Sequence, residues 1–223
     1  MILFALTACL STAPAAPAGN PLAYAEHTPA AGLPLVVVIH GMGARPENMR
    51  DSVASCKLPV RVVAPRAPTP QGEGFTWFTR QVAEDGTRTW DVDAIRARAD
   101  DIAATIRAES PTGKAVVTGF SQGGILSFVL ASIHPEAVTA AIPVAGMLPP
   151  ALEVPAGPGA PKIQALHGEA DETIPAAPTV ALIGRLKAGG WDASIETFPG
   201  IQHQVSSAVH AAWCAAIGEA TTP

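Results

Sequence analysis

Short apolar runs alternate with longer amphipathic segments along the chain. Leu35 to Ile39 is an unbroken aliphatic run, which is typical of a strand buried on both faces of a parallel sheet. Five further apolar runs predict strands at 60–64, 115–118, 141–144, 162–166 and 193–198. Pro143 weakens the fourth of these six predictions, because a central strand cannot spare a backbone N–H.

Helical periodicity fills the segments between these runs. Apolar residues recur at helical spacing at Ile95, Ala99, Ile102 and Ile106. We expect further helices over 122–132, from a cap at Thr179 to about residue 186, and over 205–217. Strands that alternate with helices indicate an α/β fold, with a mostly parallel sheet flanked by helices. A single domain over residues 31–220 accounts for the pattern.

Composition and charge narrow the class of protein. The chain has 223 residues, of which 48% are hydrophobic and 15% charged, with a formal net charge of −5. These values indicate a globular protein with no nucleic-acid partner. The sequence contains no metal-ligand motif and no phosphate-binding loop, so we expect neither a metal nor a cofactor.

Residues 1–30 differ from the rest and predict a leader followed by a linker. Met1 to Leu10 is apolar but too short to span a bilayer. Within it, the stretch Leu6 to Cys9 resembles the lipobox of bacterial lipoproteins. Together these features predict export, to the periplasm or to a membrane through a lipidated Cys9. The alternative is an Ala-rich tail with no sorting role, which leaves the protein in the cytoplasm. We expect the linker to cover residues 20–34.

Cys56 and Cys214 are the two remaining cysteines. In an oxidising compartment they can form a disulfide. Two unpaired, buried thiols are an equal alternative.

The pattern G-x-S-x-G, at residues 119–123, supplies a candidate nucleophile in Ser121. It lies between a predicted strand and a predicted helix, where a tight turn lifts the serine hydroxyl clear of the sheet. A serine needs a histidine base and an acid that orients it. The backbone N–H of the next residue, Gln122, is then one donor of an oxyanion hole. The alternative is a glycine-rich turn with an inert serine.

Four histidines follow Ser121, and His203 has the position that a catalytic base requires. It lies in a loop after the last predicted strand, at the carboxyl edge of the sheet where ligands bind. We interpret His134 and His210 as surface residues and His167 as a structural residue bonded to the backbone. The loop after the fifth strand carries three candidate acids, and position alone does not choose among them: Glu169, Asp171 and Glu172.

A family resemblance adds to this interpretation. Residues 119–124 read GFSQGG, residues 167–175 read HGEADETIP and residues 200–203 read GIQH. With the HGMG at 40–43 and the PRAP at 65–68, these motifs resemble the phospholipase/carboxylesterase family of α/β-hydrolases, which includes acyl-protein thioesterases. The resemblance implies the three-layer α/β-hydrolase fold. It also implies Asp171 as the acid, His203 as the base and the N–H of Met42 as the second oxyanion donor.

Two other features of the sequence bear on the ligand. Gly41-Met42-Gly43 after a strand also suggests a dinucleotide loop, but Pro46 occupies the position of its third glycine. Phe75, Trp77 and Phe78 form an aromatic cluster, and the resemblance implies that this stretch contributes to an acyl pocket. The alternative is that these aromatic residues cover the edge of the sheet.

The sequence therefore predicts a serine esterase that acts on a small-molecule or lipid-like ester through an acyl-enzyme. A thioesterase, a lysophospholipase or a peptidase with the same triad is the first alternative. An inactive exported binding domain on the same scaffold is the alternative from another class.

Overall fold

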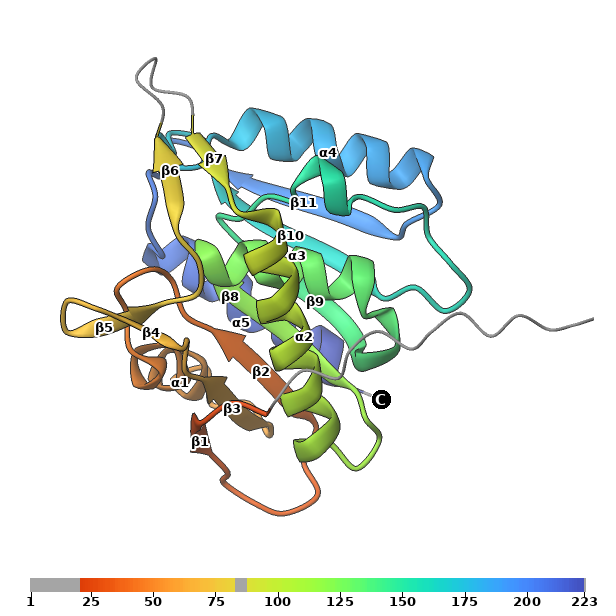
Figure 1. The fold of residues 1–223 in the computed structure, drawn as a ribbon. Coiled ribbons are helices and arrows are strands. Elements are labelled where there is room, and N and C mark those ends of the chain that lie inside the picture. Colours follow the sequence, from red (N-terminus) through yellow and green to blue (C-terminus); the bar gives the residue numbers. More distant parts are fainter. Residues whose placement is uncertain (1–20, 83–87, 223) are drawn as a thin grey trace, which may run out of the picture.

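A central sheet with helices on both faces organises the molecule (Figure 1). The computed structural model describes residues 21–82 and 88–222. Most of the predicted leader, with Cys9, lies outside these residues. Within them, the sheet has the strand order β1-β3-β2-β8-β9-β10-β11, and every neighbouring pair is parallel except β1 and β3.

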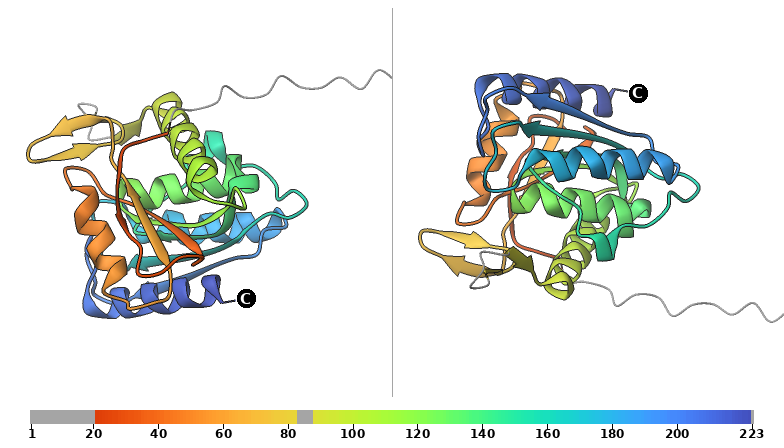
Figure 2. Two further views of the ribbon diagram at one scale, coloured as in Figure 1. Left: turned by 90° about the horizontal axis from the view of Figure 1, so that it is seen from below. Right: turned by 90° about the horizontal axis from the view of Figure 1, so that it is seen from above.

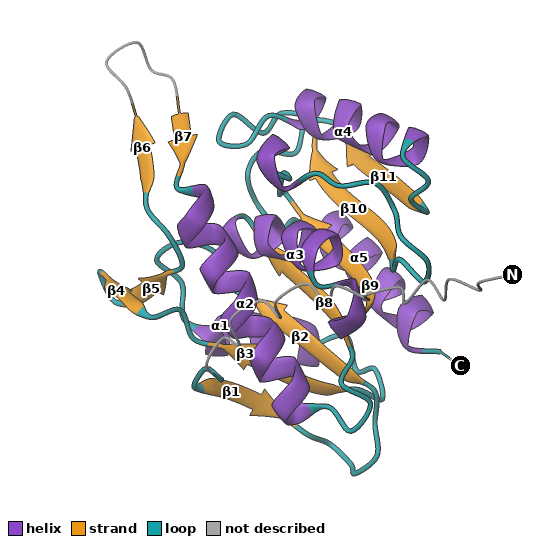
Figure 3. Ribbon diagram, turned by 45° about the vertical axis from the view of Figure 1, so that its right-hand side comes forward, coloured by secondary structure: helices purple, strands orange, loops and turns teal. Residues whose placement is uncertain are grey.

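The strands of this sheet match the predicted apolar runs, with one addition at the edge. Their bounds are Tyr24–His27 (β1), Leu35–Ile39 (β2), Arg61–Pro65 (β3), Ala115–Phe120 (β8), Val138–Val144 (β9), Lys162–Gly168 (β10) and Ala193–Phe198 (β11). Two small hairpins extend from the side that carries the start of α2 (Figure 3). They pair β4 (Thr69–Gln71) with β5 (Gly74–Thr76) and β6 (Arg80–Val82) with β7 (Arg88–Trp90).

The helices cover the two faces of the sheet unequally (Figure 2). Their bounds are Pro46–Ala54 (α1), Val92–Glu109 (α2), Gln122–Ile133 (α3), Ala176–Ala188 (α4) and Ser207–Thr221 (α5), with short 3₁₀ turns at Pro135–Ala137 and Pro150–Leu152. In β2, Val37 and Ile39 belong to the core shared with α2, α3 and α4. Val36 and Val38 belong to the second core, under α1 and α5. The strand is apolar throughout because both of its faces are covered.

Three local predictions differ from the structure, each for a physical reason. The predicted linker contains β1, whose mostly exposed side chains give no apolar signal. Helix α1 escaped prediction because only its Pro46 and Val53 are buried. The helix predicted to begin at Thr179 starts at Ala176, and the Thr179 hydroxyl donates to the Gly146 carbonyl instead of capping it.

Strand β9 runs through Pro143 in spite of the missing N–H. The residues of β9 that pair with β10 are Ala140, Ala141 and Val144, so the ladder on that side skips the proline. Pro143 itself lies opposite Gly119 of β8. The ladder between β9 and β10 is therefore interrupted around Pro143 and resumes at Val144.

Cys56 and Cys214 form a disulfide in the structure. The bond joins the turn after α1 to the middle of α5, across a sequence separation of 158 residues. Both helices lie on the same face of the sheet, and the disulfide links them directly.

Candidate active site

Ser121 occupies a strained turn between β8 and α3. Its backbone has φ 59° and ψ −116°, a conformation that is rare for a residue with a side chain. A Cβ on Gly119 or on Gly123 would collide with the carbonyl oxygen of Ile39 in the neighbouring strand. The glycines of G-x-S-x-G are thus required by the close approach of β2, and the turn that they permit presents the half-buried Ser121.

His203 lies in the loop between β11 and α5 and reaches Ser121. Its Nε2 is 2.9 Å from the Ser121 Oγ, and its Nδ1 is 2.7 Å from the Asp171 Oδ2. A carboxylate only accepts, so the Nδ1–H donates to Asp171 and the Nε2 accepts from the serine hydroxyl. The Phe120 ring packs against the imidazole, with 4.7 Å between ring centroids. The imidazole is therefore oriented to take a proton from Ser121.

Asp171 follows β10, and its side chain has no exposed surface. Its Oδ1 accepts from the backbone N–H of Thr173 at 2.9 Å and of Ile174 at 2.8 Å. These two hydrogen bonds fix the orientation of the carboxylate in the loop. Of the other two candidate acids, Glu169 and Glu172 are both exposed, and Glu169 accepts from the Thr197 hydroxyl.

A second buried histidine lies beside this carboxylate. The Nε2–H of His167 donates to the Ile174 carbonyl at 2.8 Å and lies 3.4 Å from the Asp171 Oδ2. Burial lowers the pKa of His167, against the opposing effects of the Ile174 carbonyl and Asp171. A neutral His167 thus closes the turn from Asp171 to Ile174. Its bond to the backbone fits the predicted structural role, but the sequence pattern gave no sign of its contact with Asp171.

The loop after β2 lies against the nucleophile. A Cβ on Gly41 would be 3.4 Å from the Ser121 Cβ. The Gly43 N–H donates to the Phe75 carbonyl at 2.8 Å, and the Phe75 N–H donates to the Ala44 carbonyl at 3.0 Å. These bonds tie the loop to the β4–β5 hairpin. Met42, between the two glycines, is 46% exposed.

The buried side chain of His40 holds this loop in place through two hydrogen bonds. Its Nδ1–H donates to the Gly41 carbonyl at 2.7 Å, and its Nε2 accepts from the Ala67 N–H at 3.2 Å. Burial lowers the pKa of His40 despite the hydrogen bond to Gly41. A neutral ring can make both bonds at once, so His40 fixes the backbone next to Met42.

The side chain of Gln122 is a brace that the sequence did not reveal. Its Oε1 accepts from the Thr76 hydroxyl at 3.1 Å and from the Trp77 N–H at 3.0 Å, and its Nε2 donates to the Phe78 carbonyl at 2.7 Å. The backbone N–H of Gln122 is at the first position of α3, where no carbonyl of the same helix can accept it. One residue therefore offers an N–H beside Ser121 and anchors the segment 76–78.

The three aromatic residues of the predicted acyl pocket lie in different surroundings. Trp77 and Phe78 are only 2% and 4% exposed and belong to the core, and the Trp77 indole N–H donates to the His40 carbonyl at 2.9 Å. Phe75 is half-buried, with the Arg66 guanidinium 5.1 Å from its ring centroid. Of the three, Phe75 has the accessible surface that contact with a ligand requires, and the role of all three stays a prediction.

The two histidines interpreted as surface residues also have defined partners. His134 is the C-cap residue of α3 and is only 9% exposed, and its Nε2 lies 2.7 Å from the Asp100 Oδ1. That burial corrects the interpretation of His134 as a surface residue. His210 is partly buried beside the Cys56–Cys214 disulfide.

The model of the phospholipase/carboxylesterase family matches residues 25–212 of the chain. The chain belongs to the phospholipase/carboxylesterase family. A relative from Nocardia uniformis subsp. tsuyamanensis, named "Putative esterase NocK", is 32% identical over 167 residues. The match covers 71% of this chain but 47% of that protein, so the chain spans about half the length of the relative.

Solved structures with similar folds confirm the α/β-hydrolase architecture. The crystal structure of the esterase PE8 is 21% identical, with a TM-score of 0.76 over 89% of this chain and 99% of that one. Acyl-protein thioesterase 2 of Zea mays is 19% identical, with a TM-score of 0.73 over 90% and 100% of the two chains. No helix among residues 21–82 and 88–222 has the length and apolarity needed to cross a membrane.

Proposed function

We propose that this member of the phospholipase/carboxylesterase family hydrolyses carboxylic esters through an acyl-enzyme on Ser121. The observation that carries the proposal is the unbroken chain of hydrogen bonds from Asp171 to His203 to Ser121. A serine hydroxyl is a poor nucleophile unless a base removes its proton as it attacks. His203 has that position, and Asp171 holds the imidazole in the tautomer whose Nε2 accepts.

The proposed reaction has two steps that use the same groups. In the first, the Ser121 Oγ bonds to the ester carbonyl carbon while its proton passes to His203. His203 then gives that proton to the departing alcohol as the bond between carbon and the alcohol oxygen breaks. In the second, a water molecule loses a proton to His203, attacks the acyl-enzyme and releases the acid. His203 then returns this proton to the Ser121 Oγ as its bond to the acyl group breaks, so the enzyme ends in its starting state.

The negative oxygen of each tetrahedral intermediate needs donors that are already in place. We assign this role to the backbone N–H groups of Met42 and Gln122. The support is the contact of the Gly41 backbone with Ser121, and the position of Gln122 at the start of α3. Removing one donor of an oxyanion hole typically raises the barrier by about 3–4 kcal/mol.

Apolar side chains near the oxyanion loop indicate the class of substrate. Met42 is exposed, and Phe75, which is hydrogen-bonded to the same loop, is half-buried. We therefore propose a small-molecule or lipid-like ester with an apolar part that these side chains can contact. Neither proposed step requires a metal or an organic cofactor.

Turnover of p-nitrophenyl esters of increasing chain length tests this function. We expect hydrolysis by the wild type and none above background by Ser121→Ala, with Ser207→Ala, an exposed serine, as the matched control. Thioesters with the same acyl groups are the second arm. Faster turnover of every thioester than of its matched oxygen ester would replace the ester assignment with a thioesterase. Activity that survives in Ser121→Ala would contradict the assignment of Ser121 as the nucleophile.

We also propose that the protein is exported and that Cys9 carries a lipid. The Cys56–Cys214 disulfide supports export, because disulfides persist mainly in oxidising compartments. Mass spectrometry of the native N-terminus is the test. A mature chain that begins at a lipid-modified Cys9 is the expected result, and one that begins at Met1 with an unmodified Cys9 would contradict it.

A further inference from the structure

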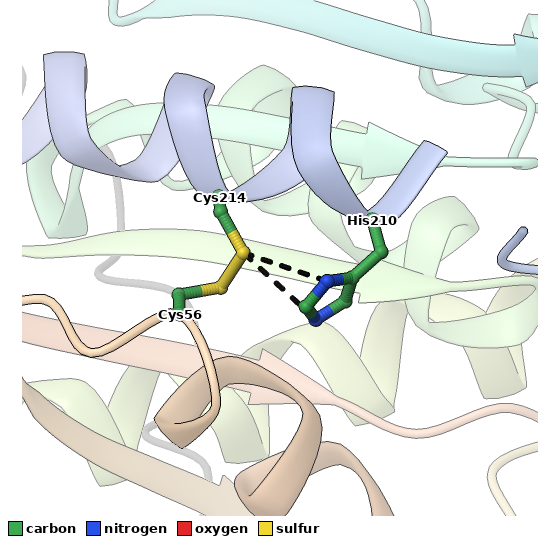
Figure 4. Close-up of side chains that lie close together, drawn as sticks. All are labelled: Cys56, His210 and Cys214. Atoms are coloured by element: carbon green, nitrogen blue, oxygen red, sulfur yellow. Dashed lines mark hydrogen bonds between the residues drawn. A yellow bond between two sulfur atoms is a disulfide. The ribbon is translucent and has the colours of Figure 1, made fainter. Parts of the chain in front are cut away.

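His210 projects toward the disulfide from the same helix as Cys214. The two residues are four positions apart in α5, one helical turn, and both side chains face Cys56 at the end of α1 (Figure 4). One ligand atom from each of Cys56, His210 and Cys214 lies within 4.8 Å of the others. The cluster is on the α1 and α5 face of the sheet, and none of its residues belongs to the proposed catalytic site.

The hydrogen bonds of His210 fix which ring nitrogen carries the proton. Its Nε2 is 3.0 Å from the Ser52 carbonyl oxygen and 3.2 Å from the Ser55 Oγ. A carbonyl only accepts, so the Nε2 is the N–H nitrogen. The Nδ1 then has a lone pair in the neutral ring. The Cys214 Sγ, which has no hydrogen to donate while it is in the disulfide, lies 3.7 Å from the Nδ1 and 3.8 Å from the Nε2, so it faces the ring.

This arrangement is the one that a metal-binding histidine has. Such residues usually coordinate through one ring nitrogen and donate the other N–H to a backbone carbonyl or a carboxylate. In His210 the Ser52 carbonyl already accepts the Nε2–H, which leaves the Nδ1 as the nitrogen that can coordinate, close to the Cys214 sulfur atom. We propose that reduction of the Cys56–Cys214 disulfide creates a zinc-class metal site formed by Cys56, Cys214 and the His210 Nδ1.

The chemistry of the three ligands selects the ion. Two thiolates and an imidazole suit Zn²⁺, which is usually tetrahedral. Bonds of about 2.0–2.3 Å place tetrahedral ligand atoms about 3.5–3.8 Å apart. The His210 Nδ1 and the Cys214 Sγ already have a separation of 3.7 Å. Breaking the bond between the two sulfur atoms lets them move apart, and a turn of the His210 ring then points the Nδ1 lone pair at the ion.

Solvent can supply both the ion and its fourth ligand. An open surface cavity of about 390 Å³ borders His210 and is lined by Ser52, Val205, Ser206 and Ser207. Cys56, His210 and Cys214 are each partly exposed. An ion can therefore reach the cluster without movement of the sheet or of the helices.

Formation of the site has two balanced steps. A dithiol reductant gives two electrons to the disulfide, its own sulfur atoms become a disulfide, and its two protons remain on the Cys56 and Cys214 thiols. The metal then displaces both thiol protons into water as the two Sγ atoms and the His210 Nδ1 bind it. The oxidised chain cannot bind in this way, because its sulfur atoms are bonded to each other.

Titration with Co²⁺, a spectroscopic stand-in for Zn²⁺, tests the proposal on the full chain with Cys9→Ser, which removes the third thiol. A phosphine is the reductant, because a dithiol would itself bind the metal. We expect one Co²⁺ per reduced chain with thiolate-to-metal charge-transfer absorption, and no such band in the oxidised chain or in Cys56→Ser/Cys214→Ser. In His210→Ala the dissociation constant should rise at least about tenfold, since loss of outer-shell partners alone costs 10–100-fold.

The control variant is His27→Ala, which removes an exposed histidine of β1 and should leave the affinity unchanged. Equal Co²⁺ affinity in His210→Ala and the parent chain would overturn the site, as would a reduced chain without the charge-transfer band. If reduction unfolds the chain, Zn²⁺ should restore its circular dichroism and raise its thermal midpoint, because metal binding then stabilises the fold. A reduced chain that stays unfolded at saturating Zn²⁺ would also overturn the proposal.

Discussion

The His203 Nδ1 lies 2.7 Å from the Asp171 Oδ2, on the side of the imidazole that faces away from Ser121. Asp171 is completely buried in its loop, whereas His203 is partly exposed. In the proposed mechanism the carboxylate therefore acts on Ser121 only through the ring, by setting which nitrogen carries the proton.

Asp171→Asn should abolish most of the activity and leave the fold in place. The amide can keep the packing, but it favours the wrong tautomer of His203, and a change of this kind lowers kcat about 10⁴-fold in a serine triad. Ester hydrolysis and a thermal melt would measure both effects. Glu169→Gln, an exposed neighbour in the same loop, should retain wild-type kcat. An equal loss in both variants would contradict the role of Asp171.

Gly123→Ala should lower both stability and activity. The added methyl group meets the backbone carbonyl of Ile39, which cannot move without shifting β2. Overpacking of this kind costs about 1–3 kcal/mol, and it displaces the turn that presents Ser121. Denaturant unfolding checks the prediction.

The matched control for that variant is Gly184→Ala, inside α4, where a Cβ meets no atom within 4 Å. Alanine there should stabilise the helix by up to about 1 kcal/mol. A Gly123→Ala protein as stable and active as Gly184→Ala would show that the close approach of β2 does not constrain the turn.

Gln122→Ala should destabilise the protein although the backbone N–H at this position remains. It leaves the Trp77 N–H without its partner and takes from the Phe78 carbonyl one of its two side-chain donors, the other being the Thr76 hydroxyl. Each buried unpaired group costs about 1–3 kcal/mol, and each kcal/mol lowers the thermal midpoint of a domain of this size by about 2–4 °C. Gln71→Ala, on the exposed β4 strand, should leave the midpoint unchanged. Equal thermal midpoints in the two variants would show that the Gln122 side chain does not stabilise the fold.

Stability should fall as the pH drops below about 6.5, the ordinary pKa of histidine. Burial lowers the pKa values of His40 and His167 in the folded protein. Below pH 6.5 the unfolded chain thus binds protons that the folded chain does not, and the free energy of unfolding becomes smaller. Thermal midpoints between pH 8 and 5 would measure the slope. His167→Gln should flatten it, and His27→Gln, an exposed change, should not.

The sequence predicted the buried strands better than the edges of the fold. The strand from Leu35 to Ile39 can be recognised in the sequence because helices cover both faces of β2, so none of its positions is polar. The edge strand at Tyr24–His27 is mostly exposed and is stabilised by antiparallel pairing with β3, which no pattern of side chains records. Helix α1 could not be predicted for a similar reason, because most of its surface is polar.

Part of the candidate site could also be predicted from the sequence. Ser121, in its G-x-S-x-G motif, and His203 both follow predicted strands, and these features predicted them as nucleophile and base. The choice of Asp171 over Glu169 came from the family resemblance, because nothing in the local sequence shows which carboxylate is buried. The bonds of the Gln122 side chain join segments far apart in the chain, so they required the structure. His167 and Asp171 are only four residues apart, but their contact depends on how the loop after β10 turns, which the sequence pattern does not show.

Covalent labelling with a fluorophosphonate tests the central claim most directly, because the reagent bonds only to a serine whose hydroxyl is activated. Intact-mass and peptide mass spectrometry should find one adduct per chain, on Ser121. The adduct should be absent in Ser121→Ala and retained in Ser207→Ala. A folded wild-type chain that gains no mass, or that carries its adduct on another residue, would contradict the assignment of Ser121 as the nucleophile.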